Sequence, residues 1–284
     1  MDLYVSDLDG TLLRGDATLS DFARRSLADL LADGMQFTVA SARSVVTMRR
    51  ILGDLPLRLP VIGFNGAYLS DLATGRPLWI GAIGAGQRDG ILGHILACGC
   101  LPFVSSSDGP RESLYYETLG NEGMAAYHTF LSRTGDSRLR PPRPLRDSLG
   151  GQVVCFTVID RRERLVDLEA RLRESGAADL SLHLFEDTHN SGSWHWLTVH
   201  AAQATKERAI GTLREVCGLG DCRVTVFGDH LNDLGMMRAA DRAVAVANAM
   251  PQVKECASLV LGPNEADSVV RFLLAEHGGQ GGAG

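Results

Sequence analysis

Short apolar runs alternate with longer amphipathic stretches in the first and last parts of the chain. Runs of the kind that form buried strands lie at residues 3–5, 37–40, 61–64, 223–227 and 243–246. Between them, apolar residues recur every three or four positions, which predicts helices near residues 20–34, 44–52, 204–216 and 265–275. A hairpin is predicted from residues 67–69 and 77–80. Strands that alternate with helices favour an α/β fold built on a doubly wound parallel sheet.

The middle of the chain has a different pattern, and the change begins at a group of glycines, Gly81, Gly84 and Gly86. Helices are predicted near residues 86–97, 121–132 and 161–174, and strands near residues 102–105, 113–118, 153–158, 180–185 and 194–199. We therefore expect an α+β domain at residues 83–200, inserted into a Rossmann-like α/β core formed by residues 1–82 and 201–284. The glycine-rich end, residues 278–284, is predicted to be disordered.

The composition is that of an ordinary globular protein. The chain has 284 residues, of which 45% are hydrophobic and 22% charged, a length that suggests about two domains. Its net charge of −6, without a long block of like charge, argues against a nucleic-acid partner. No apolar run approaches the ~18 residues that span a bilayer, and the N-terminus does not resemble a signal peptide, so we expect no membrane partner. Six scattered cysteines predict reduced thiols and a cytoplasmic protein; for its assembly we expect a monomer or a weak homodimer.

Two aspartates directly after the first apolar run are the strongest chemical signal. Asp7 and Asp9 follow residues 3–5, and the next residue, Gly10, marks a turn at the end of the predicted strand. Ligands of an open α/β sheet bind beyond the carboxyl ends of its strands. Two carboxylates so close together repel each other unless a cation binds, and Mg²⁺ suits both oxygen ligands and substrate phosphates. This favours phosphoryl transfer through an aspartyl-phosphate, and the alternative is an Asp-Gly turn without a chemical role.

Polar residues also follow other predicted strands, and one lies at the start of a predicted helix. They are Ser41, Asn65, Asp229, Asn232, Asp233 and, at the helix, Lys206. Because the carboxyl ends of parallel strands meet at one edge of the sheet, we expect these side chains to converge. Each has a simpler alternative: a serine can cap a helix, a lysine can lie in solvent, and acidic residues often occupy the first turn of a helix. Their joint occurrence favours a common site.

The run DLDGTLL, from Asp7 to Leu13, resembles motif I of the haloacid dehalogenase superfamily of phosphatases. The superfamily's other motifs have counterparts in the same order: Ser41-Ala42-Arg43 where Thr-Gly-Arg is usual, Lys206, and Gly228-Asp229-x-x-Asn232-Asp233. Two further pairs, Asn65-Gly66 and Asn248-Ala249, resemble signatures of its Cof-like branch, whose members carry a large α/β cap. The resemblance implies a Mg²⁺-dependent hydrolase whose cap, here residues 83–200, selects the substrate.

The resemblance also implies a role for each matching residue. Asp7 is the expected nucleophile and a Mg²⁺ ligand, and Asp9 is the expected general acid and base, with a metal contact through its carbonyl group. Asp229 is a further expected metal ligand, and Asp233 either binds the metal or orients Lys206. The residues expected to bind the phosphoryl group are Ser41, Arg43, Asn65, Gly66, Lys206 and Asn232.

The expected function is hydrolysis of a small phosphorylated metabolite, with sugar phosphates as the leading substrate class. In the inserted domain, His189, Asn190, Trp194 or His195 is a candidate to face the substrate, and the alternative is that these side chains are packed or exposed without contact to it. Two alternatives stay open. One is a phosphotransferase such as a phosphohexomutase, and the other is a protein that binds phosphorylated metabolites without catalysis. A nucleotide hydrolase of the P-loop type is excluded, because the chain contains no Gly-Lys pair.

Overall fold

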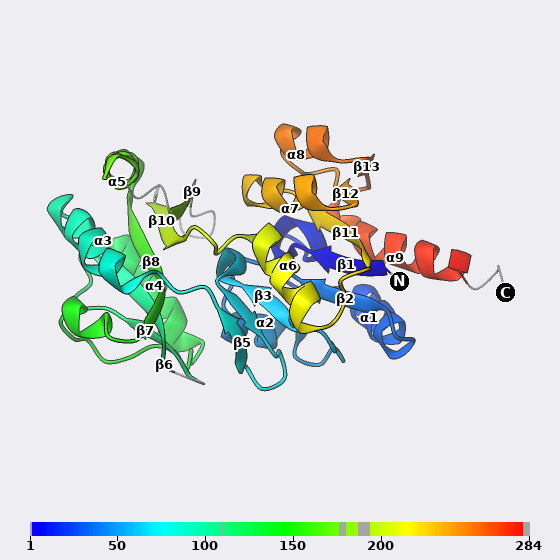
Figure 1. Ribbon diagram of the computed structural model, residues 1–284, viewed down its shortest axis with the longest axis horizontal. Helices are drawn as coiled ribbons and strands as arrows, with labels where there is room; N and C mark the ends of the chain where they lie inside the picture. The colour runs from blue at the N-terminus through cyan, green and yellow to red at the C-terminus, as the bar shows by residue number, and fades with distance from the viewer. Residues whose placement is uncertain (1, 109–110, 176–179, 187–193, 281–284) are drawn as a thin grey trace. The chain divides into compact units, whose positions relative to one another are not determined.

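The computed structural model describes residues 2–108, 111–175, 180–186 and 194–280 (Figure 1). The chain divides into two compact units, each of which is described by itself below. The core unit consists of Met1–Leu78 and Thr205–Gly284, and the inserted unit consists of Trp79–Ala204. Each crossing between the units lies four residues outside the predicted one, at 78/79 and 204/205. Within the described residues, no helix is both long enough and apolar enough to cross a membrane.

A parallel sheet forms the centre of the core unit. Its strands are β1 (Asp2–Ser6), β2 (Gln36–Val39), β11 (Arg223–Gly228), β12 (Arg242–Ala245) and β13 (Leu259–Val260). They are ordered β13-β12-β11-β1-β2, and Val5 of β1 is paired with Val226 on one side and with Thr38 on the other. The strand order therefore reverses beside β1, and in open α/β sheets ligands bind at the carboxyl ends of the strands where such a reversal occurs. The sheet confirms the predicted doubly wound fold.

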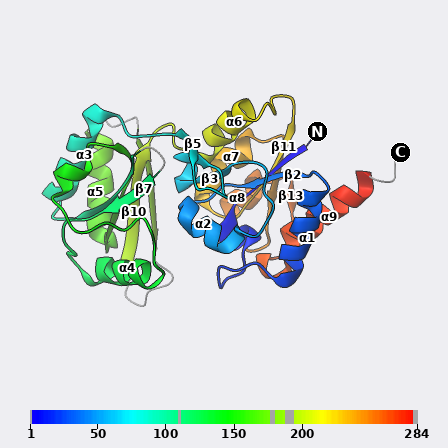
Figure 2. The same cartoon turned by 90° about the horizontal axis from the view of Figure 1, so that it is seen from below.

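Helices cover both faces of this sheet. They are α1 (Asp21–Ala32), α2 (Val45–Leu52), α6 (Lys206–Val216), α7 (Leu234–Ala239), α8 (Pro251–Cys256) and α9 (Ser268–Gln280). α1 packs against α9, whereas α7 packs against α6, α8 and the strands β11 and β12 (Figure 2). Because the strand order reverses at β1, right-handed crossovers place these two groups on opposite faces. The short elements α7, α8 and β13 were not predicted, since six residues or fewer show no clear period.

The third predicted strand does not join the parallel sheet as expected. β3 (Val61–Gly63) forms a separate antiparallel sheet with β4 (Tyr68–Ser70) and β5 (Pro77–Ile80). A single bridge between Ala40 and Ile62 connects it to the end of β2. The reason is the turn Phe64–Gly66, in which all three residues have positive φ, so the chain folds back after three strand residues.

The inserted unit is built on an antiparallel sheet of order β7-β6-β8-β10-β9. Its strands are β6 (Pro102–Asp108), β7 (Arg111–Tyr115), β8 (Gln152–Arg161), β9 (Leu180–Glu186) and β10 (Trp194–Ala201). Its helices are α3 (Ala85–Ala97), α4 (Glu122–Arg133) and α5 (Arg162–Glu174). Successive residues of β8 point to opposite faces, so Val158 packs with α3 and α5 whereas Ile159 packs with α4. This is the α+β character that the sequence predicted.

The end of the chain differs from the prediction. α9 continues through Gly278 to Gln280, so residues 278–280 are helical and not disordered. A helix gains one hydrogen bond for each residue added, and buried side chains such as Leu273 anchor the turns that precede the glycines. The last four residues, 281–284, lie outside the described part of the chain.

Candidate active site

The two acidic strand ends of the core unit lie against each other. Asp7 directly follows β1, and its N–H donates to the carbonyl oxygen of Phe227 in β11 at 2.9 Å. The chain then makes a wide turn, Leu8–Leu12, in which Gly10 has a φ of 76°. A Cβ atom at Gly10 would lie 2.5 Å from Asp229 Oδ2. Only glycine therefore allows this turn to pass so close to the carboxylate that follows β11.

Lys206, the first residue of α6, joins the two strand ends. Its Nζ donates to Asp7 Oδ1 at 2.6 Å and to Asp233 Oδ1 at 2.7 Å, and its side chain is completely buried. Burial disfavours the charged ammonium group, but the carboxylates of Asp233 and Asp7 outweigh burial and raise the pKa of Lys206 above its ordinary value. The lysine is therefore a fixed positive charge at neutral pH.

Asp233 has both carboxylate oxygens engaged. Oδ1 accepts from Lys206, and Oδ2 accepts from the backbone N–H groups of Asp229 at 3.0 Å and His230 at 3.1 Å. The side chain is completely buried. Of the two roles expected for Asp233, this geometry fits the orientation of Lys206. The same contacts also fix the loop that carries Asp229.

Three carboxylates in this region form a group that could hold a metal ion. Oxygen atoms of Asp7, Asp229 and Asp233 lie within 4.8 Å of one another. Burial, together with the neighbouring carboxylates Asp233 and Asp229, raises the pKa of Asp7 well above its ordinary value despite the opposing effect of Lys206. Burial also raises the pKa of Asp229 to about 6. One lysine thus does not offset the negative charge, and a set of carboxylate oxygens with excess charge suits a hard divalent cation such as Mg²⁺.

The sequence missed one residue that orients this group. Thr11 Oγ1 donates to Asp229 Oδ1 at 2.8 Å and so directs the other oxygen, Oδ2, toward Gly10. Thr11 is buried, whereas the turn that contains it also holds the half-exposed Asp9. A threonine that directly follows an Asp-Gly step was the available signal, but nothing in the spacing indicates its partner.

Asp9 lies outside the three-carboxylate group and is paired with Arg43. The guanidinium donates from Nε to Asp9 Oδ2 at 2.7 Å and from Nη2 to Oδ1 at 2.6 Å. Arg43 follows β2, which is paired with β1, so adjacent strand ends bring the two side chains together. The sequence placed both residues in the site but did not indicate this pairing. The bidentate contact fixes the orientation of the Asp9 side chain in the structure.

Ser41, Asn65 and Asn232 are brought to the same edge of the sheet. Ser41 is buried, and its carbonyl oxygen accepts from the N–H of Asn65 at 3.0 Å. The side chain of Asn65 accepts in turn from Asn232 Nδ2 at 3.0 Å. The alternative of a helix cap does not apply to Ser41, because Ser44 caps α2 by accepting from Thr47 N–H. Ser41 Oγ instead accepts from the N–H of Arg43 at 3.1 Å.

Gly66 supports the site through its backbone. It has a φ of 110°, and a Cβ atom there would lie 2.3 Å from the carbonyl oxygen of Thr205. The turn Phe64–Gly66 therefore packs directly against the residue that precedes Lys206. This close approach explains the need for glycine at position 66 and places the start of α6 beside Asn65.

The residues expected to face a substrate from the inserted unit are only partly described. His189 and Asn190 lie outside the described residues. Trp194 is buried with Ile159 beneath α4, and the guanidinium of Arg161 lies 4.0 Å from its ring centroid. Trp194 is therefore a packing residue of the inserted unit. His195, its neighbour in β10, has no hydrogen-bond partner at Nδ1 among the described residues.

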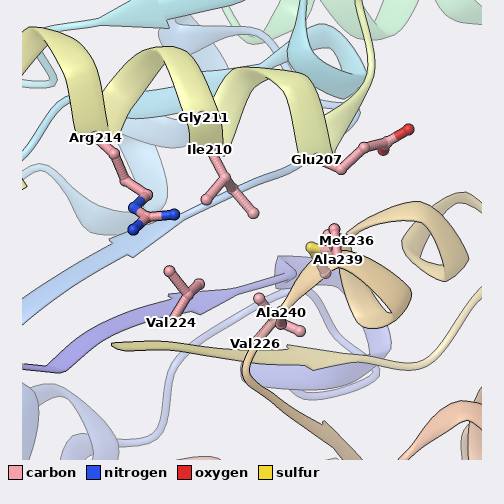
Figure 3. A pocket seen from close by; sticks show the side chains of 9 residues that line it. All are labelled: Glu207, Ile210, Gly211, Arg214, Val224, Val226, Met236, Ala239 and Ala240. Carbon is pink, nitrogen blue, oxygen red and sulfur yellow. The ribbon is translucent and has the colours of Figure 1, made fainter. Parts of the chain in front are cut away.

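A pocket of about 180 Å³ lies elsewhere in the core unit, between α6, β11 and α7 (Figure 3). Apolar side chains such as Ile210 and Met236 line it, with Glu207 near one end and Arg214 at the other. Arg214 is bonded to carbonyl oxygens in the loop after α6, including that of Leu219 at 3.3 Å. The pocket contains none of the predicted site residues, so it takes no part in the chemistry considered below.

The core unit is thus an α/β protein with a doubly wound sheet, a lysine-bridged carboxylate group at the carboxyl edge of that sheet, and an inserted α+β unit. The sequence profile of the haloacid dehalogenase-like hydrolase family matches residues 4–273. The chain therefore belongs to the haloacid dehalogenase-like hydrolases. The predicted resemblance to this family and the expected hydrolase class are confirmed.

Named relatives match almost the whole chain. The 5-amino-6-(5-phospho-D-ribitylamino)uracil phosphatase YitU of Bacillus subtilis (strain 168) is 24% identical over 281 residues, which cover 95% of this chain and 96% of that protein. The pyridoxal phosphate phosphatase YbhA of Escherichia coli (strain K12) is 26% identical, and the match covers 95% of this chain and 96% of that protein. The crystal structure of TM0651 from Thermotoga maritima has a TM-score of 0.76 at 24% identity, covering 96% of this chain and 97% of that one. The last comparison shows the fold alone.

Proposed function

We propose that this protein is a Mg²⁺-dependent phosphatase that hydrolyses a small phosphorylated metabolite through an aspartyl-phosphate. The observation that carries the proposal is the buried Lys206, which bridges Asp7 and Asp233 while Asp229 completes a group of carboxylates within 4.8 Å. A carboxylate held in place by a fixed ammonium group is a positioned nucleophile. The relatives named above are phosphatases, which supports this reaction over transfer to a second sugar or binding without catalysis.

In the first step, Asp7 attacks phosphorus with a carboxylate oxygen. The bond between phosphorus and the ester oxygen breaks, and the leaving oxygen takes a proton from Asp9. Asp7 and Asp229 would hold Mg²⁺ with the carbonyl group of Asp9, and the bound ion would offset phosphoryl charge. Lys206 keeps Asp7 in position and stabilises the charge that develops on the phosphoryl oxygens.

In the second step, a water molecule attacks the phosphorus of the aspartyl-phosphate. Asp9, now a carboxylate, accepts the proton of this water, inorganic phosphate leaves, and Asp7 is restored. For both steps Asp9 has to leave its pairing with Arg43, and the half-exposed position of its side chain leaves room for that movement. The phosphoryl oxygens would be held by Ser41, Arg43, Asn65, Gly66, Lys206 and Asn232.

We assign the choice of substrate to the inserted unit and favour sugar phosphates as the substrate class. Metal and phosphoryl groups are provided for in the core unit, so discrimination among leaving groups has to come from other residues. We further propose a cytoplasmic protein, monomeric or weakly dimeric, without a nucleic-acid or membrane partner. Its cysteines, all six of which lie among the described residues, are free, as a reducing compartment requires.

The test compares the wild type with Asp7→Asn, using p-nitrophenyl phosphate and then a panel of phosphorylated metabolites, each with Mg²⁺ and with a chelator. An amide is a poor nucleophile, so we expect turnover to fall at least a thousandfold, on the order expected for loss of a covalent catalyst. Asp29→Asn, at an exposed position of α1, is the control and should keep full activity. Phosphate release by Asp7→Asn at the wild-type rate, or full wild-type activity in the chelator, would contradict the proposal.

A further inference from the structure

The loop between β12 and α8, residues 246–250, touches both segments that carry candidate metal ligands. Asn248 Nδ2 donates to the carbonyl oxygen of Gly10 at 2.7 Å. Two residues later, the N–H of Met250 donates to the carbonyl oxygen of Asp229 at 2.8 Å. Gly10 belongs to the turn that follows Asp7. One short loop is thus bonded to the backbone of both acidic segments.

The side-chain amide of Asn248 can take only one orientation here. Gly10 offers a carbonyl oxygen, which only accepts, whereas the backbone N–H of Asn264 only donates, and it donates to Asn248 Oδ1 at 3.0 Å. Asn264 then donates through its own Nδ2 to the carbonyl oxygen of Leu13 at 2.8 Å. The two asparagines therefore hold the turn after Asp7 at two places, Gly10 and Leu13.

The position of Gly10 sets how closely the two acidic segments approach. A Cβ atom at Gly10 would lie 2.5 Å from Asp229 Oδ2, so its backbone already packs tightly against that carboxylate. A shift of the turn would change the separation between Asp7 and Asp229. Mg²⁺ requires nearly ideal octahedral geometry at about 2.0–2.1 Å, so a displacement of a few tenths of an ångström weakens its binding.

We infer that Asn248 is a positioning residue, which fixes the spacing of Asp7 and Asp229 for Mg²⁺ without touching metal or substrate. The inference rests on the proposed function, because that function gives the spacing its purpose. Asparagine is required, since aspartate cannot donate to Gly10 and would place a charged oxygen 2.7 Å from a carbonyl oxygen.

The test measures Mg²⁺ binding by titration calorimetry without substrate, and in parallel the Mg²⁺ concentration for half-maximal hydrolysis of p-nitrophenyl phosphate. Asn248→Asp is compared with Gln252→Glu, an exposed position in α8 that undergoes the same change in charge. An added negative charge alone would tighten binding of a cation in both variants. A positioning role predicts the opposite for Asn248→Asp, which should bind Mg²⁺ at least about tenfold more weakly than the wild type. Gln252→Glu should bind Mg²⁺ with an affinity equal to that of the wild type or slightly higher.

Asn248→Ala keeps the test decisive if the aspartate variant does not fold. It removes the donor without adding a charge, and we expect about three- to tenfold weaker Mg²⁺ binding with a circular-dichroism melting curve close to that of the wild type. Mg²⁺ binding by the Asn248 variants equal to that of Gln252→Glu would overturn the inference. Failure of the proposed function would look different, because the wild type itself would then bind no Mg²⁺ or release no phosphate.

Discussion

The core unit and the inserted unit each bury a group of charged side chains in which carboxylates outnumber cations. In the core unit, Lys206 is shared between carboxylates that follow two different strands. In the inserted unit, Arg138 donates from Nε and Nη2 to both oxygens of Asp136, only two residues away, at 3.0 and 2.8 Å. Nearby Glu112, in β7, has both carboxylate oxygens buried without a hydrogen-bond partner among the described residues.

The two groups compensate their excess charge in different ways. Burial, and to a lesser extent Asp136, raises the pKa of Glu112 to about 7 against the opposing effect of Arg138, so this carboxyl group takes up a proton near neutral pH. Among the described residues, Glu112 belongs to no group of carboxylates that could hold a metal ion, whereas oxygen atoms of Asp7, Asp229 and Asp233 lie within 4.8 Å of one another. A metal ion can therefore complete the core group, and a proton is enough for the inserted one. Arg138 and Asp136 are paired within one segment and stabilise the inserted unit, whereas Lys206 joins carboxylates from two segments and so assembles a candidate cation site.

The largest effect is expected for Lys206→Met, which removes the shared cation. Leaving buried carboxylates uncompensated costs about 3–5 kcal/mol of folding free energy, and loss of a charged group beside the reacting phosphoryl lowers turnover at least about a hundredfold. Saturating Mg²⁺ should restore about 2–3 kcal/mol, since it binds the folded state alone. Urea unfolding followed by circular dichroism, with and without Mg²⁺, checks this. If Mg²⁺ left the stability unchanged, the core group would not be a cation site.

Arg138→Met makes the matching change in the inserted unit. We expect the free energy of unfolding to fall by about 3 kcal/mol, because Asp136 and Glu112 then lack a compensating charge. Mg²⁺ should not restore any of this stability. Two of the three tryptophans, Trp194 and Trp196, lie in β10 of the inserted unit, whereas Trp79 lies in β5 at the boundary between the units. Tryptophan fluorescence therefore follows unfolding of the inserted unit when the variants are made in a Trp79→Phe background. If Mg²⁺ restored the stability of Arg138→Met as much as that of Lys206→Met, the two charged groups would not differ in their ability to bind a cation.

Glu112→Gln should have the smallest effect, and its sign depends on pH. The folded pKa of about 7 lies above the ordinary value of 4.5, so Glu112 makes its full contribution below pH 4.5, and stability is lost as pH rises through 7. The amide cannot ionise, so the free energy of unfolding of the variant, relative to that of the wild type, should rise by about 2 kcal/mol between pH 5 and pH 8. Fluorescence-detected urea unfolding at both pH values measures this. If the free energies of unfolding of the two proteins differed by the same amount at pH 5 and at pH 8, Glu112 would not be the group that takes up the proton.

Much of the site follows from the sequence because of one geometric rule. Parallel strands end at one edge, so residues that directly follow such strands, among them Asp7, Ser41 and Asp229, can be assigned to one site from their place in the chain. The rule says nothing about which atoms meet across that edge. The pairing of Arg43 with Asp9 depends on side-chain direction, and such contacts are not encoded by spacing.

The fold shows the same division between what periodicity reveals and what it does not. Long amphipathic helices such as α1 and the buried strands of the parallel sheet have a clear period, and they lie where they were predicted. The position of β3 outside that sheet depends on positive φ values in the turn Phe64–Gly66. Asn65 and Gly66 are residue types that often adopt such a conformation, but Phe64 is not, so the antiparallel return of the chain could not be anticipated.

The central position of β1 also has a consequence for the newly made chain. β1 is synthesised well before its neighbour β11, because residues 7–222 lie between the two strands. At a synthesis rate of roughly 5–20 residues per second, one edge of β1 waits on the order of 10 to 40 seconds for its partner. During that interval the inserted unit, whose sheet pairs only with itself, can emerge and fold as a whole. We therefore expect the inserted unit to complete its folding on the ribosome before the parallel sheet does, although β1 and β2 of that sheet are synthesised earlier.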